Sequence, residues 1–351
     1  MRPPPLDPLI HLSRSRQRGS VILFVLGMIL LTSFLLTRFI NRAHTELLTE
    51  ARKSLEAPLR DEAYSALQVS LAVLADIASV DGGLHSPDQG WGDPIAYADY
   101  VPPEGLEVTV QITDESGKFS LAQPKEEALR GLFESLGLLP LDAERVIDTM
   151  FTWTLPDHAA KFNEADEATY SRMDPPLTLP QKPLRTLEEL RLMPAIRQFL
   201  CDEAGHWNET GQRFLQNVSL FAFDQVNLNT ASEEVLRSLG LDDNVLARRS
   251  ARSDSPADRR SAIFYTRDDA ATALGNLPDS ASLGVSATGF RVMIIANQGG
   301  RKFQLEAIVR LGGRAPAPSS DEEVTSEPRP WTRNSIDSPF RILEIRENNG
   351  F

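Results

Sequence analysis

The chain has 351 residues, 41% of them hydrophobic, and a formal net charge of −13 at pH 7. This length and composition allow one large hydrophobic core or two linked ones. The acidic balance argues against a general nucleic-acid binder, because such proteins neutralise phosphates with Lys and Arg. Cys201 is the single cysteine, so the chain forms no intramolecular disulfide.

A short basic segment precedes Gly19-Ser20, and an apolar run over residues 21–37 follows directly. The run is at the short end of what crosses a hydrocarbon core of about 30 Å. A secretory signal carries its cleavage site after the apolar run, not before it. Cleavage between Gly19 and Ser20 would therefore leave the hydrophobic helix attached, and an ordinary membrane anchor is the alternative.

This arrangement resembles the leader of type IV prepilins, which a prepilin peptidase cuts and whose new N-terminus is then methylated. Most members carry a glutamate at the fifth mature residue, where this chain has Phe24. An apolar residue there is typical of general secretion pathway protein K, the K-type minor pseudopilin. A carboxylate inside the bilayer is costly unless it is paired, and in pilins it pairs with the terminal amine of a neighbouring subunit. Phe24 is thus the membrane assembly position, and it suits a subunit at the top of a fibre.

Apolar residues at helical spacing continue beyond the membrane run to about Val80. This pattern predicts an amphipathic extension of the helix, and Pro58 predicts a kink or a restart within it. A membrane anchor joined to a coiled-coil stalk is the alternative, but heptads do not persist.

Alternating apolar residues over 106–112 predict a half-buried strand. The turn residues 114–117 then predict a hairpin with 118–121 as its second strand. Asp114 and Glu115 are expected to be solvated turn carboxylates, since adjacent turn residues point apart and make a poor catalytic pair. Residues 113–121 resemble a protein K signature, with Ala122 in place of its polar ending.

Helical patterns begin at Pro124 and Asp142. In protein K the second of these helices usually ends in Asp-Trp-(Ile/Leu)-Asp, whereas this chain has Thr152-Trp153-Thr154. The two missing carboxylates weaken the case for any metal site implied by the resemblance.

Carboxylates nevertheless gather in the loop that follows. Calcium takes six to eight oxygen ligands in flexible geometry, so four of these residues are candidate calcium ligands: Asp157, Glu164, Asp166 and Glu167. Their spacing matches no EF-hand loop, and a solvated acidic loop is the alternative.

Two capping boxes are predicted, Thr186 with Glu189 and Thr230 with Glu233. The segments around both resemble protein K. The second also resembles helix-hairpin-helix modules that contact DNA phosphates, although the usual glycine-containing hairpin is not clean. A structural helix pair is the preferred interpretation.

A short helix is expected over 268–277, followed by a hairpin of strands 290–296 and 302–311. Residues 312–333 are rich in Pro, Ser and Glu and predict a linker, and 338–345 is a candidate edge strand. No catalytic constellation emerges, because the five histidines are scattered and no Walker or Gly-x-Ser-x-Gly motif occurs. We therefore expect no enzyme and no cofactor other than calcium.

The resemblance runs over residues 14–312 and implies an α+β fold. We expect a type IV pilin-like helical spine packed on a small antiparallel sheet, with a large, mostly helical inserted lobe. The expected parts are a leader (1–19), the transmembrane half of the helix (20–40), a periplasmic helix with the first part of the head (41–123), an inserted helical domain (124–280), a C-terminal hairpin (281–311), and a flexible linker and tail (312–351).

The resemblance further implies a minor pseudopilin that nucleates the type II secretion pseudopilus, so that folded proteins cross the outer membrane. The implied partners are the I-, J- and H-type minor pseudopilins, the G-type major pseudopilin and the prepilin peptidase. The expected location is the inner membrane, with a cytoplasmic N-terminus and a periplasmic C-terminal domain. Two alternatives stay open: a tip subunit of a type IV pilus, and a membrane-tethered DNA-uptake protein.

Overall fold

The structure is a computed structural model that describes residues 17–122, 124–162, 166–253, 259–275, 277, 282–312 and 339–350. The chain divides into two compact units, residues 1–58 and 59–351. The first helix, α1 (Gln17–Asp81), belongs to both and contains Pro58. Because α1 is continuous through this proline, the helix does not restart there.

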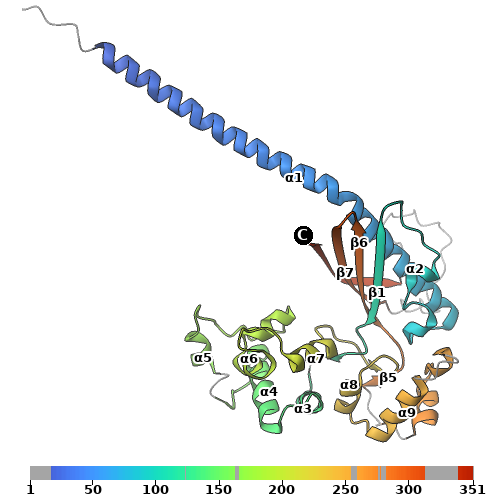
Figure 1. Cartoon of the computed structure of the whole chain (residues 1–351). Coiled ribbons are helices and arrows are strands. Elements are labelled where there is room, and N and C mark those ends of the chain that lie inside the picture. The colour runs from blue at the N-terminus through green and yellow to red at the C-terminus, as the bar shows by residue number, and fades with distance from the viewer. Residues whose placement is uncertain are drawn as a thin grey trace, which may run out of the picture. The chain divides into compact units, whose positions relative to one another are not determined.

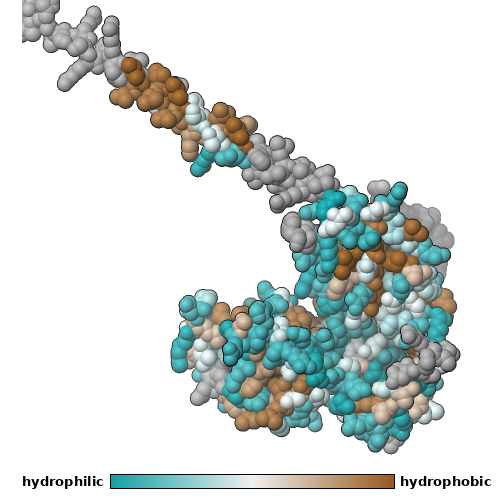
Figure 2. All heavy atoms as spheres, in the orientation of Figure 1, coloured by the Kyte–Doolittle hydropathy of each residue, from teal (hydrophilic) through white to brown (hydrophobic). Residues whose placement is uncertain are grey.

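In the first unit, Ile22–Arg42 is long and apolar enough to cross a membrane. Figure 2 shows this part of α1 as a largely hydrophobic band. The Thr32 and Thr37 hydroxyls donate hydrogen bonds to the Met28 and Ser33 carbonyls, 2.9 and 2.8 Å away. The polar groups are therefore satisfied within the helix, as a hydrocarbon environment requires.

The second unit begins with the C-terminal part of α1, residues 59–81, which we call the spine. The spine also passes the length and composition test for a membrane span, but it is partly buried inside the protein. Its apolar face packs against a four-stranded antiparallel sheet (Figure 1). The sheet order is β1 (Glu107–Asp114), β6 (Gly289–Gln298), β7 (Arg301–Leu311) and β8 (Phe340–Gly350). We call the spine, this sheet and the segment 82–106 that connects them the head.

The hairpin of β6 and β7 confirms the predicted pair of strands. Its turn contains Gly299 and Gly300, whose φ values of 57° and 81° favour glycine. The buried core between spine and sheet combines side chains at helical and at alternating spacing: Leu59, Ala63, Leu67, Leu74, Phe290, Val292, Ile294, Leu305 and Ala307.

The outermost strand, β8, lies in the region predicted as linker and tail, and it extends past the edge strand predicted over 338–345. Its residue Glu347 contacts the spine, accepting hydrogen bonds from Arg60 Nη2 at 2.8 Å and from Tyr64 Oη at 2.6 Å. Strand β8 is thus an integral part of the head.

The chain between β1 and β6 forms a helical lobe, residues 115–288. Its α-helices are α3 (Glu126–Ser135), α4 (Pro140–Thr154), α5 (Glu167–Ser171), α6 (Pro194–Leu200), α7 (Glu209–Asn217), α8 (Glu233–Ser238), α9 (Asp243–Ser253) and α10 (Arg267–Leu274). Buried residues such as Leu129, Phe133 and Phe214 give the lobe a hydrophobic core separate from that of the head. The predicted α+β architecture, with a helical lobe inserted into a spine-and-sheet head, is confirmed.

Two short parallel strand pairs join the first and last segments of the lobe to its middle. Strand β2 (Phe119–Ser120) pairs with β3 (Val218–Ser219), and β4 (Val226–Asn227) pairs with β5 (Leu283–Gly284). The predicted hairpin between 106–112 and 118–121 is therefore wrong. Phe119 and Leu121 belong to the core of the lobe, and their burial there outweighs the local turn signal.

Candidate functional site: the anchor helix and the head–lobe junction

The residues predicted for processing and membrane assembly lie near the start of α1. Gly19 and Ser20 are within the helix. Phe24 is 72% exposed, so its ring is open to a surrounding membrane. No acidic residue occurs between residues 21 and 37. The anchor therefore offers no carboxylate to a neighbouring subunit, and the roles of these three residues stay predictions.

The acidic loop of the lobe is only partly described, because Glu164 lies outside the described residues. Asp157 and Glu167 are exposed. Asp166 caps α5, with its carboxylate accepting a hydrogen bond from the Thr169 backbone N–H at 2.7 Å, and this bond lowers the pKa of Asp166. Among residues that the structure describes, no group of three or more His, Cys, Asp or Glu side chains is placed to hold a metal.

The sequence analysis did not identify Asp148, whose carboxylate binds several residues of this loop. Asp148 on α4 is buried and accepts hydrogen bonds from His158 Nε2 at 2.8 Å and from the backbone N–H groups of Lys161 and Phe162 at 2.9 and 3.0 Å. The sequence did carry a signal for this role, because Asp148 lies among the apolar residues Ile147 and Met150 of a predicted helix, where a carboxylate is expected to be buried and hydrogen-bonded. Asp148 thus orders the chain between Asp157 and the other candidate calcium ligands.

Calcium remains a proposal for this loop. We expect calorimetric heat on titration of the protein with calcium, and a higher melting temperature at millimolar calcium. Binding to the folded state alone adds about 2.7 kcal/mol of stability at about 100 times the Kd. Substituting Asp157→Asn with Glu167→Gln should remove both effects, whereas Glu203→Gln, an exposed acid elsewhere in the lobe, should not. Absence of heat and of any thermal shift in the native protein contradicts the calcium hypothesis.

The junction between head and lobe is built around Asp114, the last residue of β1. One carboxylate oxygen accepts hydrogen bonds from the backbone N–H and the hydroxyl of Ser116. The other accepts from Asn227 Nδ2 at 2.7 Å and Thr230 Oγ1 at 2.6 Å. Burial raises the pKa of Asp114, and these hydrogen bonds oppose that rise. One side chain thus joins the first strand of the head to a distant part of the lobe.

Other contacts draw the same segments together. Asn227 also donates to the His85 carbonyl at 2.8 Å, and His85 Nδ1 lies 2.8 Å from the Val285 carbonyl. Gly117 packs so closely that a Cβ atom there would lie 2.5 Å from Thr230 Oγ1. The junction therefore fits together without space for a larger residue at this turn.

Glu115 is fully buried, in a cluster of charges beside Asp114. Its Oε1 accepts from Arg291 Nε at 2.7 Å and Lys118 Nζ at 2.6 Å, and Arg291 also pairs with Glu306. Burial alone would raise the pKa of Glu115, but the hydrogen bond from Arg291 and the charge of Lys118 lower it below the ordinary value. The prediction that Asp114 and Glu115 are solvated is wrong, because the lobe covers the turn.

The two predicted capping boxes have different outcomes. Thr186 and Glu189 form theirs, at the start of the 3-10 helix Leu187–Leu192. The prediction for Thr230 and Glu233 is wrong: Ser232 caps α8 by accepting from the Val235 N–H at 3.2 Å. Thr230 instead donates to Asp114, so a tertiary partner replaces the local one.

The arginines of the helix-hairpin-helix-like segment make contacts within the protein. Arg249 is half-buried, the desolvation lowers its pKa, and its Nη2 lies 3.4 Å from the Asn229 carbonyl. Arg252 stacks on the Phe264 ring, 5.0 Å from its centroid. These contacts support a structural helix pair over a DNA-binding one.

The comparisons with known proteins agree with this geometry. The family described as Type II secretion system (T2SS), protein K matches residues 111–204, which include Asp114, Glu115 and the first part of the lobe. Among solved structures, a chain of the GspK-GspI-GspJ complex from the enterotoxigenic Escherichia coli type 2 secretion system is similar at 15% identity. The alignment covers 86% of this chain and 99% of that one, with a TM-score of 0.59. No curated protein matches the chain.

Proposed function

We propose that this chain is a K-type minor pseudopilin of a type II secretion system, since the protein K family model matches residues 111–204, and that it sits at the tip of the pseudopilus and nucleates the fibre. Growth of the fibre below it would then drive folded proteins across the outer membrane. In this proposal α1 anchors the protein in the inner membrane, with the N-terminus in the cytoplasm and the head and lobe in the periplasm. The membrane-spanning length of Ile22–Arg42 supports the anchor.

The observation that carries the tip position is the apolar Phe24 within an anchor that has no acid over residues 21–37. An unpaired carboxylate at mid-helix costs about 2.5–3.5 kcal/mol on insertion scales, so shaft subunits keep one only where an amine neutralises it. A subunit with no neighbour above it has no such amine to receive. Phe24 avoids the cost of the carboxylate and gives up a pairing that a tip subunit does not use.

The proposed direct partners are the I- and J-type minor pseudopilins, since the similar solved chain comes from a complex of GspK, GspI and GspJ. The H-type and G-type subunits would follow below them, and the prepilin peptidase would process the leader. The alternatives of a type IV pilus subunit and a DNA-uptake protein are not favoured, because the matching family is that of type II secretion.

Assembly through the folded part of the protein is testable with Phe24→Glu. Full-length protein in mild detergent should co-purify with the I- and J-type pseudopilins, and Phe24→Glu should capture equal amounts of both. If the wild type captures neither, the tip complex is wrong. If only the variant loses them, the membrane segment and not the head determines the position of the protein.

Processing provides a second test. N-terminal mass spectrometry of the membrane-extracted protein should find Ser20 as the first residue, and Gly19→Leu should leave the precursor uncut because a side chain there crowds the peptidase site. Leu6→Ala, in the same leader, should be cut normally. An intact Met1 in the native protein would contradict the prepilin assignment.

A further inference from the structure

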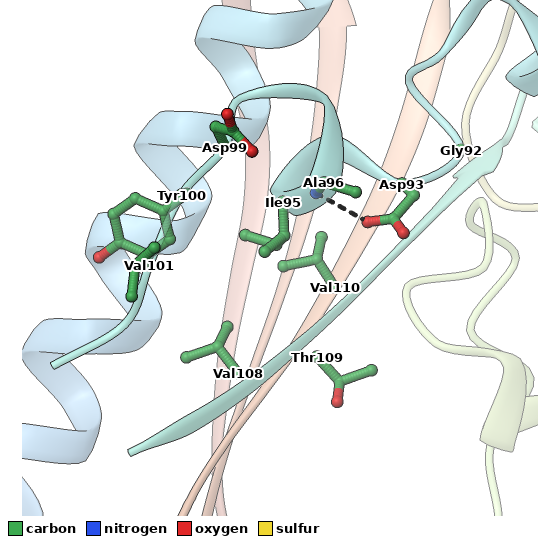
Figure 3. A pocket seen from close by; sticks show the side chains of 10 residues that line it. All are labelled: Gly92, Asp93, Ile95, Ala96, Asp99, Tyr100, Val101, Val108, Thr109 and Val110. Atoms are coloured by element: carbon green, nitrogen blue, oxygen red, sulfur yellow. Dashed lines mark hydrogen bonds between the residues drawn. The ribbon is translucent and has the colours of Figure 1, made fainter. Parts of the chain in front are cut away.

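One charged side chain of the membrane anchor differs from those of the head in how its charge is satisfied. In the head, Asp93 caps α2 (Pro94–Tyr97) by accepting from the Ala96 N–H at 3.1 Å, the bond drawn in Figure 3. Its partner thus lies a few residues away in the same chain. The guanidinium of Arg38, in the anchor, has no carboxylate within such reach.

Arg38 lies inside the part of α1 that is long and apolar enough to cross a membrane. This part extends over Ile22–Arg42, so the backbone of Arg38 is about 6 Å from its C-terminal end at 1.5 Å per residue. Phe39 and Ile40, which follow Arg38, are apolar and 70% and 55% exposed. The charge is therefore attached to a segment whose neighbours on both sides are suited to hydrocarbon.

The side chain of Arg38 turns toward the middle of this span. Its guanidinium carbon lies 5.2 Å from the centroid of the Phe34 ring, one turn earlier in α1, as expected for a long side chain on a helix, which points toward the N-terminus. Phe34 is 56% exposed and Arg38 is exposed as well. The cation thus lies on the outer surface of the helix, where an unpaired charge in a membrane is costly.

The chain does not supply the counter-charge. Its sequence contains no Asp or Glu between residues 8 and 45. The first acid after the span, Glu46, is about 12 Å from Arg38 along the helix axis, and it pairs with Arg42 at 2.8 Å. The anion that neutralises Arg38 must therefore come from the surroundings of the helix.

Phosphate is the anion that a membrane offers at this depth. A guanidinium binds phosphate through two parallel N–H···O bonds, and it is less strongly hydrated than an ammonium group. Arg42, on the same face of the helix one turn closer to the headgroups, is already neutralised by Glu46, so Arg38 is the charge that remains. A zwitterionic headgroup brings its own cation to its phosphate, whereas an anionic headgroup does not. An anionic phospholipid therefore fits best.

We propose that Arg38 binds the headgroup phosphate of an anionic phospholipid, in the leaflet at the C-terminal end of the span, with the Phe34 ring on the inner side of the site. The inference rests on the part of the proposed function that places α1 in a membrane, and it does not depend on the tip position. A carboxylate in the span of a neighbouring subunit is the competing counter-charge. The lipid is favoured because it surrounds the exposed guanidinium before any subunit joins.

The reporter is a tryptophan beside the site, Phe39→Trp, in full-length protein reconstituted into phosphatidylcholine vesicles that contain phosphatidylglycerol with brominated acyl chains. Bromine quenches tryptophan fluorescence on contact, and the four native tryptophans all lie outside the span, so the change in quenching measures local phosphatidylglycerol. We expect an enrichment of about fivefold over the bulk membrane, the usual effect of one basic residue near an anionic surface. Arg38→Gln should abolish the enrichment. Arg38→Lys, which keeps the charge without the planar fork, should retain only part of it.

Matched controls locate the effect. Arg341→Gln removes an exposed arginine of β8 and should leave the quenching of the Phe39→Trp reporter unchanged. A second reporter, Phe24→Trp, lies near the other end of the span, and Arg38→Gln should not change its quenching. Inorganic phosphate in excess should not reduce the enrichment. If it does, the site binds a free anion and the lipid proposal is wrong.

The remaining outcomes separate this inference from the anchor itself. If alkaline carbonate extracts the wild type from the vesicles, α1 does not span the membrane and the proposed anchor is wrong. If the protein resists extraction but Arg38→Gln and wild type show equal enrichment, the anchor stands and the lipid site is wrong. If Arg38→Gln keeps the enrichment yet fails to capture the I- and J-type pseudopilins, a carboxylate of a partner is the counter-charge, which also overturns the lipid site.

Discussion

Replacement of Asp114 by alanine is expected to lower the free energy of unfolding by about 3–5 kcal/mol, since each buried donor left without an acceptor costs about 1–3 kcal/mol. Four donors lose their acceptor at once: the backbone N–H and the hydroxyl of Ser116, Asn227 Nδ2 and Thr230 Oγ1. Because these donors come from the start of the lobe and from a segment more than 100 residues further along it, the loss should also loosen the lobe from the head.

The measurement is urea unfolding of the full-length protein in detergent, with limited proteolysis of the native state. The Asp114→Ala variant should be cut more rapidly within residues 115–288 than the wild type. Asp166→Ala is the control, because loss of an exposed helix cap costs only about 1 kcal/mol. If the two variants are destabilised equally, the junction does not depend on Asp114.

Replacement of Arg291 by methionine should destabilise the protein by a similar amount, about 3–5 kcal/mol, because it leaves the buried carboxylate of Glu115 with only Lys118. The double variant Glu115→Gln with Arg291→Met should recover much of this loss, since the fully buried carboxylate is then gone and the groups that lose a partner, Lys118 and Glu306, are only partly buried. Arg237→Met, which removes a more exposed pair with Glu233, should cost less than about 1 kcal/mol. A double variant no more stable than Arg291→Met would show that the charges are not the cause.

The same cluster should respond to acid. The pKa of Glu115 is lowered in the folded protein, so its contribution to stability is present above the unfolded pKa of about 4.3 and is lost as the pH falls through the folded value. Arg291→Met removes the main cause of this lowered pKa. The difference in unfolding free energy between wild type and variant should therefore shrink below about pH 4, which urea titrations at several pH values will measure.

Local signals in the sequence were sufficient where neighbours in the chain are also neighbours in space. The hairpin of β6 and β7 has its turn glycines between two alternating runs, and the box of Thr186 and Glu189 closes within four residues. Helical spacing likewise predicted the apolar face that the spine buries. In each case the signal lies within a few residues of the chain, even where, as for the spine, the surface it packs against is distant in the sequence.

The junction could not be predicted in this way, because its partners are distant in the sequence. Asp114 and Thr230 each have a plausible local role, one in a turn and one in a cap, yet they bond to each other at 2.6 Å. Glu115 finds its cation on β6, at Arg291. The segments that contain Asp114, Glu115 and Thr230 resemble protein K in sequence, but this resemblance does not indicate that these residues contact one another. Only the fold shows that they do.

The placement of the lobe has a consequence for the order in which the chain acquires its structure. Strand β1 ends at Asp114, and its neighbour β6 begins at Gly289. At about 5–20 residues per second, synthesis reaches β6 roughly 10–30 s after β1 has been made. The whole lobe is therefore synthesised before β6 and β7 can pair with β1. Until then the apolar faces of β1 and the spine stay uncovered. The sheet that defines the head therefore forms after the lobe, and β8, which follows β7 in the chain, completes it.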